Sequence, residues 1–208
     1  MTFDIREDLS HGGDLDEGAA EEYKSYLFNG FTESPEGKAI AEPGWSKMVL
    51  DYLIGYVGVT PADMALSDLQ EVLLELFPRK VSCAPKDAPE IVEECLAFFR
   101  FLGREYDLAS ATACIKMLSD GATVTKLQAG LANPQNFGMA KGFMMQGQQL
   151  GFDMSTKRGI DEWTSAHNAG LVGPRPVVQA LTSAVGRSAI EAKKRERQAE
   201  KAARKKNR

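Results

Sequence analysis

Few side chains in this chain are of the types that perform acid–base or nucleophilic catalysis. Histidine, the most frequent general acid or base, occurs only as His11 and His167. His167 follows Trp163 by one helical turn and has no Asp or Glu three or four residues away, so we expect its imidazole to stack on Trp163 or to lie at the surface. His11 lies in a segment without periodicity. Neither histidine predicts a catalytic site.

Candidate metal ligands and phosphate-binding glycines also lack the spacing that such sites require. His11, Asp14 and Asp16 carry suitable ligand atoms, but their spacing matches no zinc or calcium ligand set. The phosphate-loop, dinucleotide-binding and nucleophile-elbow glycine patterns are absent from the sequence. We therefore expect no metal and no cofactor. The lack of catalytic residues argues against an enzyme without excluding one.

The three cysteines, Cys83, Cys95 and Cys114, are an odd number and form no C-x-x-C pair, so neither a disulfide framework nor a zinc knuckle is indicated. Free thiols suit a reducing compartment. No window approaches the roughly 18 apolar residues of a membrane-spanning helix, and the acidic N-terminus does not resemble a secretory signal. We expect a cytoplasmic protein that does not bind membranes.

The net charge of −4 conceals an acidic body and a basic tail. Residues 187–208 contain 10 Lys and Arg against 3 Glu, a net charge of +7, whereas the rest of the chain holds 15 basic and 26 acidic residues, a net charge of −11. Such a tail can bind nucleic acid without sequence preference, contact another acidic partner, or only increase solubility. The expected contact residues are Lys193, Lys194, Arg195, Arg197, Lys201, Arg204, Lys205, Lys206 and Arg208.

A segment rich in glycine and methionine, residues 133–152, is the second candidate for function. Each glycine inside a helix costs about 1 kcal/mol relative to alanine, so four of them need a reason. Glycines four residues apart share one helix face and allow another backbone to approach closely. The segment therefore packs within the chain, forms a dimer face, or lines a ligand pocket with adaptable methionines. The candidate residues are Gly138, Gly142, Phe143, Met144, Met145 and Gly147.

Two helices, predicted over residues 67–77 and 87–103, contain the densest apolar sequence. Ser67 and Asp87 are predicted to cap their first turns, and Pro78 is predicted to stop the first helix. The second helix is apolar on nearly all sides, which is typical of a helix at the centre of a bundle. We expect this pair to form the structural centre of the protein.

The connector between those two helices carries two adjacent cations, Arg79 and Lys80, and is longer than most helix connections. It is a candidate surface site, although the two cations could simply complement the C-terminus of the preceding helix. Cys83 also lies in this connector, where we expect it to be the most exposed thiol, with a pKa lowered by Arg79 and Lys80.

The remaining sequence predicts further helices. A helix of about three turns is indicated by the three- and four-residue spacing of Trp45, Met48, Val49, Tyr52, Leu53 and Tyr56. Residues 107–133 predict two short helices, which raises the possibility of a helix-turn-helix motif, although the second helix has few side chains that read bases.

Together, these patterns predict an all-α, single-domain bundle of about seven to nine helices. We expect a flexible acidic segment over 1–13, a helical globular domain over 14–186, and a projecting basic tail over 187–208. The favoured function is a non-enzymatic binding or adaptor protein whose body contacts proteins, as a homodimer in one version, and whose tail contacts nucleic acid or an acidic partner. One alternative is a helical enzyme or small-ligand carrier with a pocket lined by residues 133–152. Another is a DNA-binding regulator that uses residues 107–133.

Overall fold

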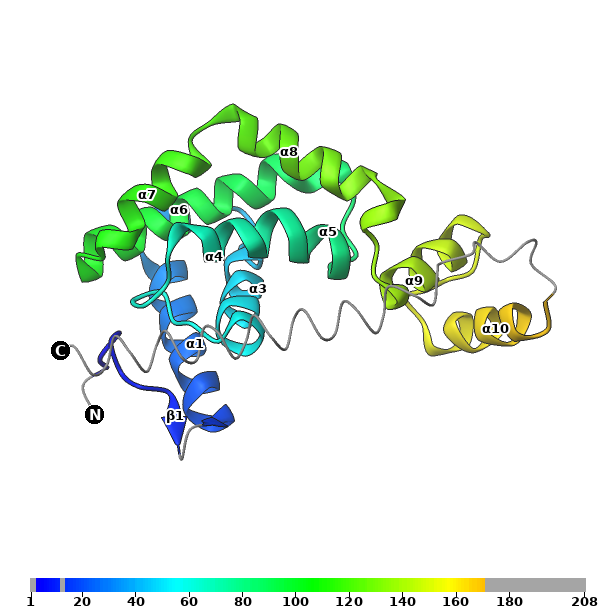
Figure 1. Cartoon of the computed structure of the whole chain (residues 1–208), viewed down its shortest axis with the longest axis horizontal. Helices are drawn as coiled ribbons and strands as arrows, with labels where there is room; N and C mark the ends of the chain where they lie inside the picture. Colours follow the sequence, from blue (N-terminus) through cyan, green and yellow to red (C-terminus); the bar gives the residue numbers. More distant parts are fainter. Residues whose placement is uncertain (1–2, 12–13, 171–208) are drawn as a thin grey trace. The chain divides into compact units, whose positions relative to one another are not determined.

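Helices account for most of the structure, a computed structural model that describes residues 3–11 and 14–170. The predicted all-α fold is confirmed, with ten α-helices, several of them short, in this part of the chain (Figure 1). Its β-structure is one antiparallel pair of two-residue strands, β1 (Ser10–His11) and β2 (Asp14–Leu15). None of the described helices is long and apolar enough to cross a membrane.

The elements follow one another in a simple order along the chain. The α-helices are α1 (Glu17–Glu33), α2 (Pro35–Lys38), α3 (Trp45–Asp51), α4 (Leu66–Glu71), α5 (Phe77–Lys80), α6 (Ala88–Tyr106), α7 (Ala109–Leu118), α8 (Gly121–Ala132), α9 (Met139–Gln149) and α10 (Lys157–Asn168). The other helical turns are the π-helical η1 (Tyr52–Val57) and η2 (Val72–Leu76) and the 3-10 turns η3 (Pro85–Asp87) and η4 (Pro134–Asn136).

Two of the helical segments after α2 contain a π-helical turn. The turn η1 continues α3, and η2 joins α4 to α5, so that one helical rod runs from Leu66 to Lys80. Pro78 lies in the first turn of α5, where the hydrogen-bond ladder changes from the π to the α register. Proline has no N–H to donate, so it is tolerated where the regular pattern of helical hydrogen bonds changes. The predicted stop at Pro78 is therefore wrong.

The central helix of the bundle is α6, as the sequence predicted. Its buried side chains occur on nearly every turn, and both its ends are well defined. Asp87 occupies the N-cap position and Pro89 lies in the first turn, but the Asp87 carboxylate accepts from the Ala84 N–H, at 2.7 Å, so the predicted side-chain cap is wrong. The helix does not end at Gly103, because that glycine instead lets α7 approach: a Cβ there would lie 3.2 Å from Cβ of Ala111. It ends at Asp107, in the left-handed region with φ of 50°.

Glu94 is the most unusual residue of this core, because its carboxylate is fully buried in the middle of α6. It accepts hydrogen bonds from the backbone N–H groups of Gly44, at 2.9 and 3.0 Å, of Trp45, at 3.0 Å, and of Ser46, at 2.7 Å. The Ser46 hydroxyl donates a further bond at 2.6 Å. Gly44 offers no side chain to cap α3, so Glu94 supplies the cap from another helix.

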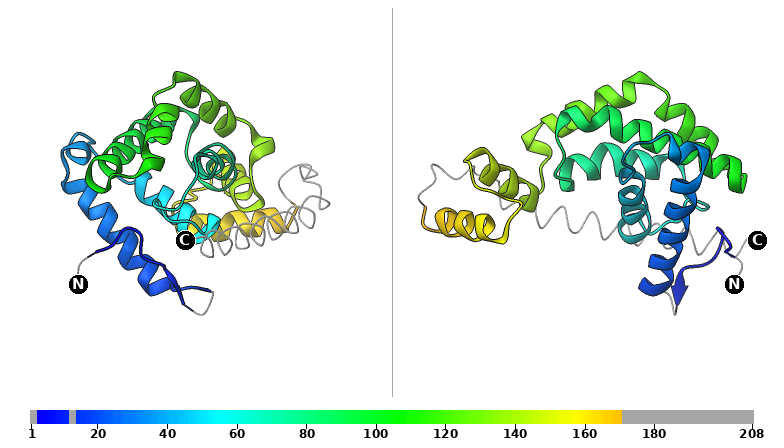
Figure 2. Two further views of the ribbon diagram at one scale, coloured as in Figure 1. Left: turned by 60° about the vertical axis from the view of Figure 1, so that its left-hand side comes forward. Right: turned by 180° about the vertical axis from the view of Figure 1, so that it is seen from behind.

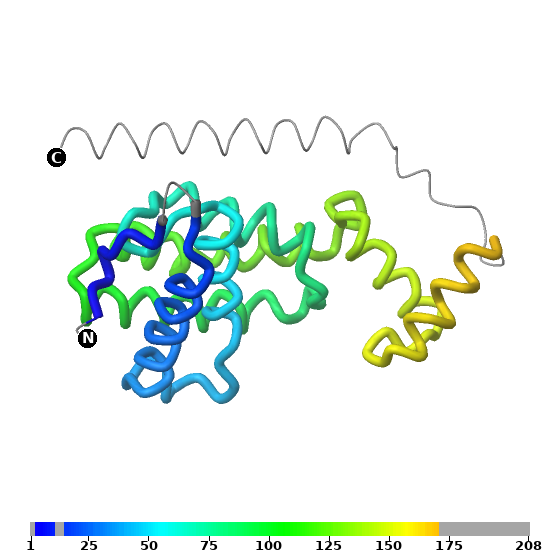
Figure 3. The backbone as a smooth tube through the Cα atoms, turned by 90° about the horizontal axis from the view of Figure 1, so that it is seen from below, coloured from blue at the N-terminus to red at the C-terminus, as the bar shows by residue number. Residues whose placement is uncertain are grey.

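The helices α1 and α3 lie side by side and cross the direction of α4, α5 and α6 (Figures 1 and 2). The ammonium of Lys24 joins the two by an ion pair with Asp51, at 2.6 Å. The tube in Figure 3 shows the same neighbours from below, with α1 beside the turn of chain that leads into α3.

The amino-terminal segment packs on α1 rather than standing apart from the core. Ile5 and Leu9 are buried, and the hydroxyl of Tyr23 donates to the carbonyl of Ile5 at 2.8 Å. Phe3 stacks on Tyr26, with the ring centroids 3.9 Å apart. The predicted flexibility of residues 1–13 is thus not confirmed in their described part. The packing comes from apolar residues of this otherwise acidic amino-terminal segment.

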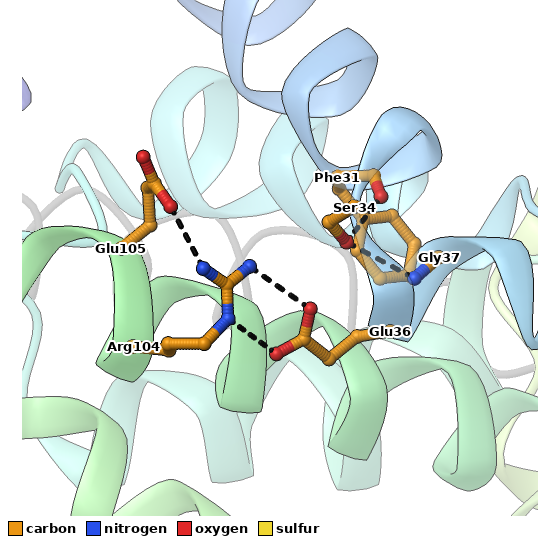
Figure 4. A network of polar contacts seen from close by, with 6 residues as sticks. All are labelled: Phe31, Ser34, Glu36, Gly37, Arg104 and Glu105. Atoms are coloured by element: carbon orange, nitrogen blue, oxygen red, sulfur yellow. Dashed lines mark hydrogen bonds and ion pairs between the residues drawn. The ribbon is translucent and has the colours of Figure 1, made fainter.

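A surface ion pair fixes α2 to α6 (Figure 4). The Arg104 guanidinium donates from Nε and Nη2 to the two oxygens of Glu36, at 2.8 and 3.0 Å. These hydrogen bonds lower the pKa of Glu36 to about 2. The adjacent Ser34 hydroxyl caps α2 by accepting from the Gly37 N–H at 3.1 Å.

The chain divides into two compact units, residues 1–141 and 142–208. The division falls inside the predicted 14–186 domain, so a single domain is not confirmed. In the second unit, Trp163 of α10 is fully buried and donates from Nε1 to the carbonyl of Phe143 at 3.0 Å. Its ring also contacts Phe152, with centroids 5.4 Å apart. This aromatic cluster is the core of the described part of that unit.

Candidate functional site

The π-helical turns η1 and η2 lie against each other in the first unit and support a row of aromatic side chains. Turns of this kind are rare and occur frequently at functional sites. One side of α3 and η1, including Leu53 and Ile54, is buried in the core. Trp45, Tyr52 and Tyr56 flank that side and are only half-buried. The row is therefore partly available to a binding partner.

The row has a cationic end, which we name the aromatic–cationic face and define as Tyr52, Tyr56, Arg79 and Lys80. The ring centroids of Tyr52 and Tyr56 are 6.3 Å apart, and Tyr52 rests on the buried ring of Phe77 at 5.8 Å. The Lys80 ammonium lies 4.5 Å from the centroid of the Tyr56 ring. Burial raises the pKa of the Tyr52 hydroxyl, with smaller effects in the same direction from Tyr56 and from the carboxylate of Asp51.

The opposite end of the row carries a negative charge. The Trp45 indole lies 6.5 Å from the Phe77 ring, and its Nε1 donates to a carboxylate oxygen of Glu90 at 3.4 Å. A polyanion is repelled at this end and attracted at the other. The aromatic–cationic face is thus the part of the row that fits a negatively charged partner.

Arg79 and Lys80, predicted as a surface site, are both exposed at the end of α5. Residues that follow α8 donate hydrogen bonds to backbone carbonyls of this turn. The Gly138 N–H donates to the Arg79 carbonyl at 2.8 Å, and the Lys141 ammonium donates to the Pro78 carbonyl at 2.9 Å. The two cations belong to the last turn of α5, and the Lys80 ammonium contacts the Tyr56 ring.

Lys141, which lies close to the end of α5, is a buried ionisable residue with only 3% of its surface exposed. Besides the Pro78 carbonyl, its ammonium contacts the Phe137 ring, 4.4 Å from the centroid. No carboxylate pairs with it in the described part of the chain. Burial lowers the pKa of Lys141, and the nearby Cys83 thiol has a smaller opposing effect.

Two of the glycines in the 133–152 segment are explained by packing within the chain. A Cβ at Gly138 would lie 2.9 Å from the Arg79 carbonyl oxygen, and one at Gly147 would lie 2.6 Å from Sδ of Met154 and 2.8 Å from Cδ1 of Trp163. Gly142, in contrast, has nothing within 4 Å of such a Cβ.

Three other members of this segment, Phe143, Met144 and Met145, are half-buried. The Phe143 ring contacts Trp163 and His167, with centroids 5.3 and 5.2 Å away. These contacts favour internal packing for Phe143. A ligand or dimer face over Gly138, Gly142, Phe143, Met144, Met145 and Gly147 stays a prediction.

The groups considered for catalysis are not arranged for it in the described residues. His167 packs against Trp163, with ring centroids 5.1 Å apart, as the sequence predicted. Cys83, Cys95 and Cys114 are all buried, and burial raises the pKa of each thiol. Cys83 is the most exposed of the three, as predicted, but only 6% of its surface is exposed, so the predicted lowering of its pKa is wrong. No group of three potential metal ligands occurs in this part of the chain.

The comparisons with known proteins add no family. No family model matches the chain, and no curated protein or solved structure matches it.

The tail cations from Lys193 to Arg208 lie outside the described residues, so their role stays a prediction. The sequence alone indicates the helix over 45–56 and the pair Arg79 and Lys80 separately. It does not indicate that they form one face, because the two segments approach each other only in the folded chain.

Proposed function

We propose that this chain is a non-enzymatic binding protein whose basic tail, residues 187–208, contacts nucleic acid or another acidic partner, and whose helical body makes protein contacts. The charge separation carries the proposal: +7 in the tail against −11 in the rest of the chain. Ten cations in one segment can neutralise phosphates and release counterions. A cytoplasmic location is part of the same proposal.

Support for a non-enzymatic role comes from what the polar groups of the body do. Glu94 caps α3, Lys24 bridges α1 and α3, and Arg104 holds α2. Each of these charges is engaged in stabilising helix positions. The described thiols and the imidazole of His167 are packed against apolar neighbours, as the previous section describes.

The test is a titration of fluorescently labelled oligonucleotides with the full chain and with a chain that ends at Gly186, over a range of salt concentrations. The full chain should show a negative slope of log K against log salt, of about 0.7 per phosphate contacted on a single strand. Loss of the tail should reduce both affinity and slope. A full-length variant with the tail sequence scrambled is the matched control, and it should bind as the native chain does.

Two results would contradict the proposal. Equal affinity and equal salt slope with and without residues 187–208 would remove the tail from binding. A tail variant with its cations replaced by glutamine that still binds like the native chain would show that charge is not the cause.

A further inference from the structure

The tail and the body differ in the chemistry that they offer to a nucleic acid. Residues 187–208 contain cations but no aromatic side chain, so they can neutralise phosphates without stacking on bases. Proteins that bind single strands combine cations along the backbone path with aromatic rings on which bases stack. In the first unit, the aromatic–cationic face provides both kinds of side chain in one place.

The rings of this face are fixed in position before any ligand arrives. Tyr52 rests on the buried Phe77 ring, and η1, which carries both tyrosines, contacts η2. Rings that are already held lose little conformational entropy on binding. Both rings are half-buried, which leaves part of each for a base.

The cations of this face are not taken up by other charges. Arg79 and Lys80 are exposed and form no ion pair in the part of the chain that the structure describes. The Lys80 ammonium lies over the Tyr56 ring, so a base that stacks on this ring must displace it. The displaced ammonium, on its flexible stem, would then remain close enough to contact the phosphate of that nucleotide.

The surface beyond α5 lacks the negative charge of the rest of the body. The helix α8 packs against α5, and residues 121–141 contain no Asp or Glu. Lys126 on α8 is exposed. Because the rest of the body is acidic, this region is where a phosphate backbone meets least repulsion. The Trp45 end of the row, with Glu90, is by contrast unsuitable for a polyanion.

From these observations we infer that the aromatic–cationic face binds single-stranded nucleic acid, with bases against Tyr52 and Tyr56 and phosphates at Arg79 and Lys80. The inference rests on the proposed function, and it adds to it a site on the body and a strand preference. The tail then contributes affinity without regard to base or strand, and the face contributes the preference for unpaired bases.

The experiment measures affinity of the full chain for three labelled probes of equal length: a thymidine single strand, the same strand with abasic residues, and a duplex. The native chain should bind the single strand at least about 5-fold more tightly than the abasic strand, the smallest effect expected from stacking one base. Tyr56→Leu should bring this ratio close to one. Tyr56→Phe keeps the ring and should preserve the ratio.

Variants of the cations separate charge from stacking. Lys80→Met retains the aliphatic stem over Tyr56 but removes the charge, so it should weaken binding of all three probes and reduce the salt slope by about 0.7. It should leave the ratio of single-strand to abasic affinity unchanged. Lys38→Met, on the exposed surface of α2, is the matched control and should alter neither quantity.

The design distinguishes failure of this inference from failure of the proposed function. If deletion of residues 187–208 lowers affinity but the native ratio is one, the tail binds and the face does not. If the ratio survives Tyr56→Leu in a chain with native circular dichroism, the inference is likewise overturned. If deletion of the tail changes nothing while the ratio is large, the proposed function fails and the face stands alone.

A measurement on the native chain guards against misfolded variants. Photo-cross-linking with a 5-iodouracil single strand, followed by mass spectrometry, should recover peptides that contain Tyr52 or Tyr56. Cross-links confined to residues 187–208 would overturn the inference. A face that binds a protein partner but gives no cross-link to the oligonucleotide would do so as well.

Discussion

Glu94 and Lys141 are both buried ionisable residues of the first unit, but their surroundings differ in completeness. Glu94 receives three backbone N–H groups and one hydroxyl, and it lies at the positive end of α3. Lys141 has one carbonyl and the face of one ring. An ammonium can donate three hydrogen bonds, so most of the hydration that Lys141 lost is not replaced. The desolvation of the Glu94 charge is compensated by hydrogen bonds, whereas that of the Lys141 charge is compensated only in part.

The number of hydrogen bonds around each buried charge distinguishes a charge that stabilises this core from one that does not. A buried charge stabilises a fold only when surrounding dipoles and hydrogen bonds compensate for its desolvation. By that criterion Glu94 holds the start of α3, and therefore the position of the aromatic row that follows. Lys141 lacks such compensation, and burial accordingly lowers its pKa.

Removing the Glu94 carboxylate should have the largest effect. Glu94→Ala leaves the N–H groups of Gly44, Trp45 and Ser46 buried without an acceptor, and should lower the free energy of unfolding by about 3 to 5 kcal/mol. Urea denaturation followed by circular dichroism measures this. Glu93→Ala, one residue earlier and exposed, should change it by less than about 0.5 kcal/mol. Similar losses in both variants would refute the cap.

Removing only the hydroxyl contribution should have a smaller effect. Ser46→Ala deletes the 2.6 Å hydrogen bond to Glu94 but leaves the three backbone donors in place. A hydrogen bond to a charged group contributes about 1.5 to 3 kcal/mol, and the same denaturation experiment should show a loss in that range. In the Glu94→Ala background, Ser46→Ala should cost much less, and full additivity of the two changes would contradict the coupling.

Neutralising Lys141 should act in the opposite direction. Lys141→Met removes a poorly compensated charge from the interior and should raise the free energy of unfolding by about 1 kcal/mol at pH 7. Burial lowers the pKa of Lys141 in the folded state, so the unfolded chain binds the proton more tightly. Native stability should therefore rise with pH up to the unfolded pKa of about 10.4, and the advantage of the variant should shrink.

A matched comparison isolates the effect of burial on this lysine. Lys126→Met removes a charge from the exposed side of α8 and should show no pH-dependent difference from the native chain. Thermal unfolding at pH 7, 8.5 and 10 covers the relevant window. A Lys141→Met variant that is less stable than the native chain at pH 7 would show that the bond to Pro78 outweighs desolvation.

The surface pair of Glu36 and Arg104 should give the smallest effect and a different pH dependence. Glu36→Gln should cost about 1 kcal/mol at pH 7, the upper end for an exposed ion pair, because the geometry is bidentate but the Arg104 side chain is about half exposed. Arg104 lowers the pKa of Glu36 to about 2, below its unfolded value near 4.3. The contribution is complete above the unfolded pKa and disappears as pH falls toward 2. Acid titration of both chains should show their stabilities converging in that window.

Local sequence signals identified much of the fold. The Asp87 position and the proline in the first turn placed the start of α6, although the predicted side-chain cap is not formed, and the all-apolar pattern placed that helix at the centre. The three- and four-residue spacing from Trp45 to Tyr56 identified a helix that is indeed half-buried. These signals are local because caps and amphipathic faces depend on residues within one or two turns.

What the sequence could not show depends on contacts between distant segments. Glu94 is one of several glutamates on α6, and nothing local distinguishes it from the exposed Glu93. Its role appears only when Gly44, 50 residues away, meets it. In the same way, the left-handed Asp107 replaced the glycine expected to end α6, because Gly103 was needed for the close approach of α7.

The candidate site was predictable only in pieces. Arg79 and Lys80 stood out as adjacent cations in a connector, but the ring under Lys80 belongs to a segment more than twenty residues earlier. The turns η1 and η2 gave no signal in periodicity, since residues at three- and four-residue spacing occur on both α- and π-helical turns.

The two π-helical turns have a consequence for how this surface responds to insertion and deletion. In an α-helix each residue turns the chain by about 100° around the axis, so losing one residue from η1 or η2 rotates everything after it by that amount. Tyr56 lies at the end of one such turn, and Lys80 follows the other. The alignment of ring and cation thus depends on chain length within these turns as well as on residue identity. A library of single-residue deletions would expose this dependence, which a scan of substitutions leaves hidden.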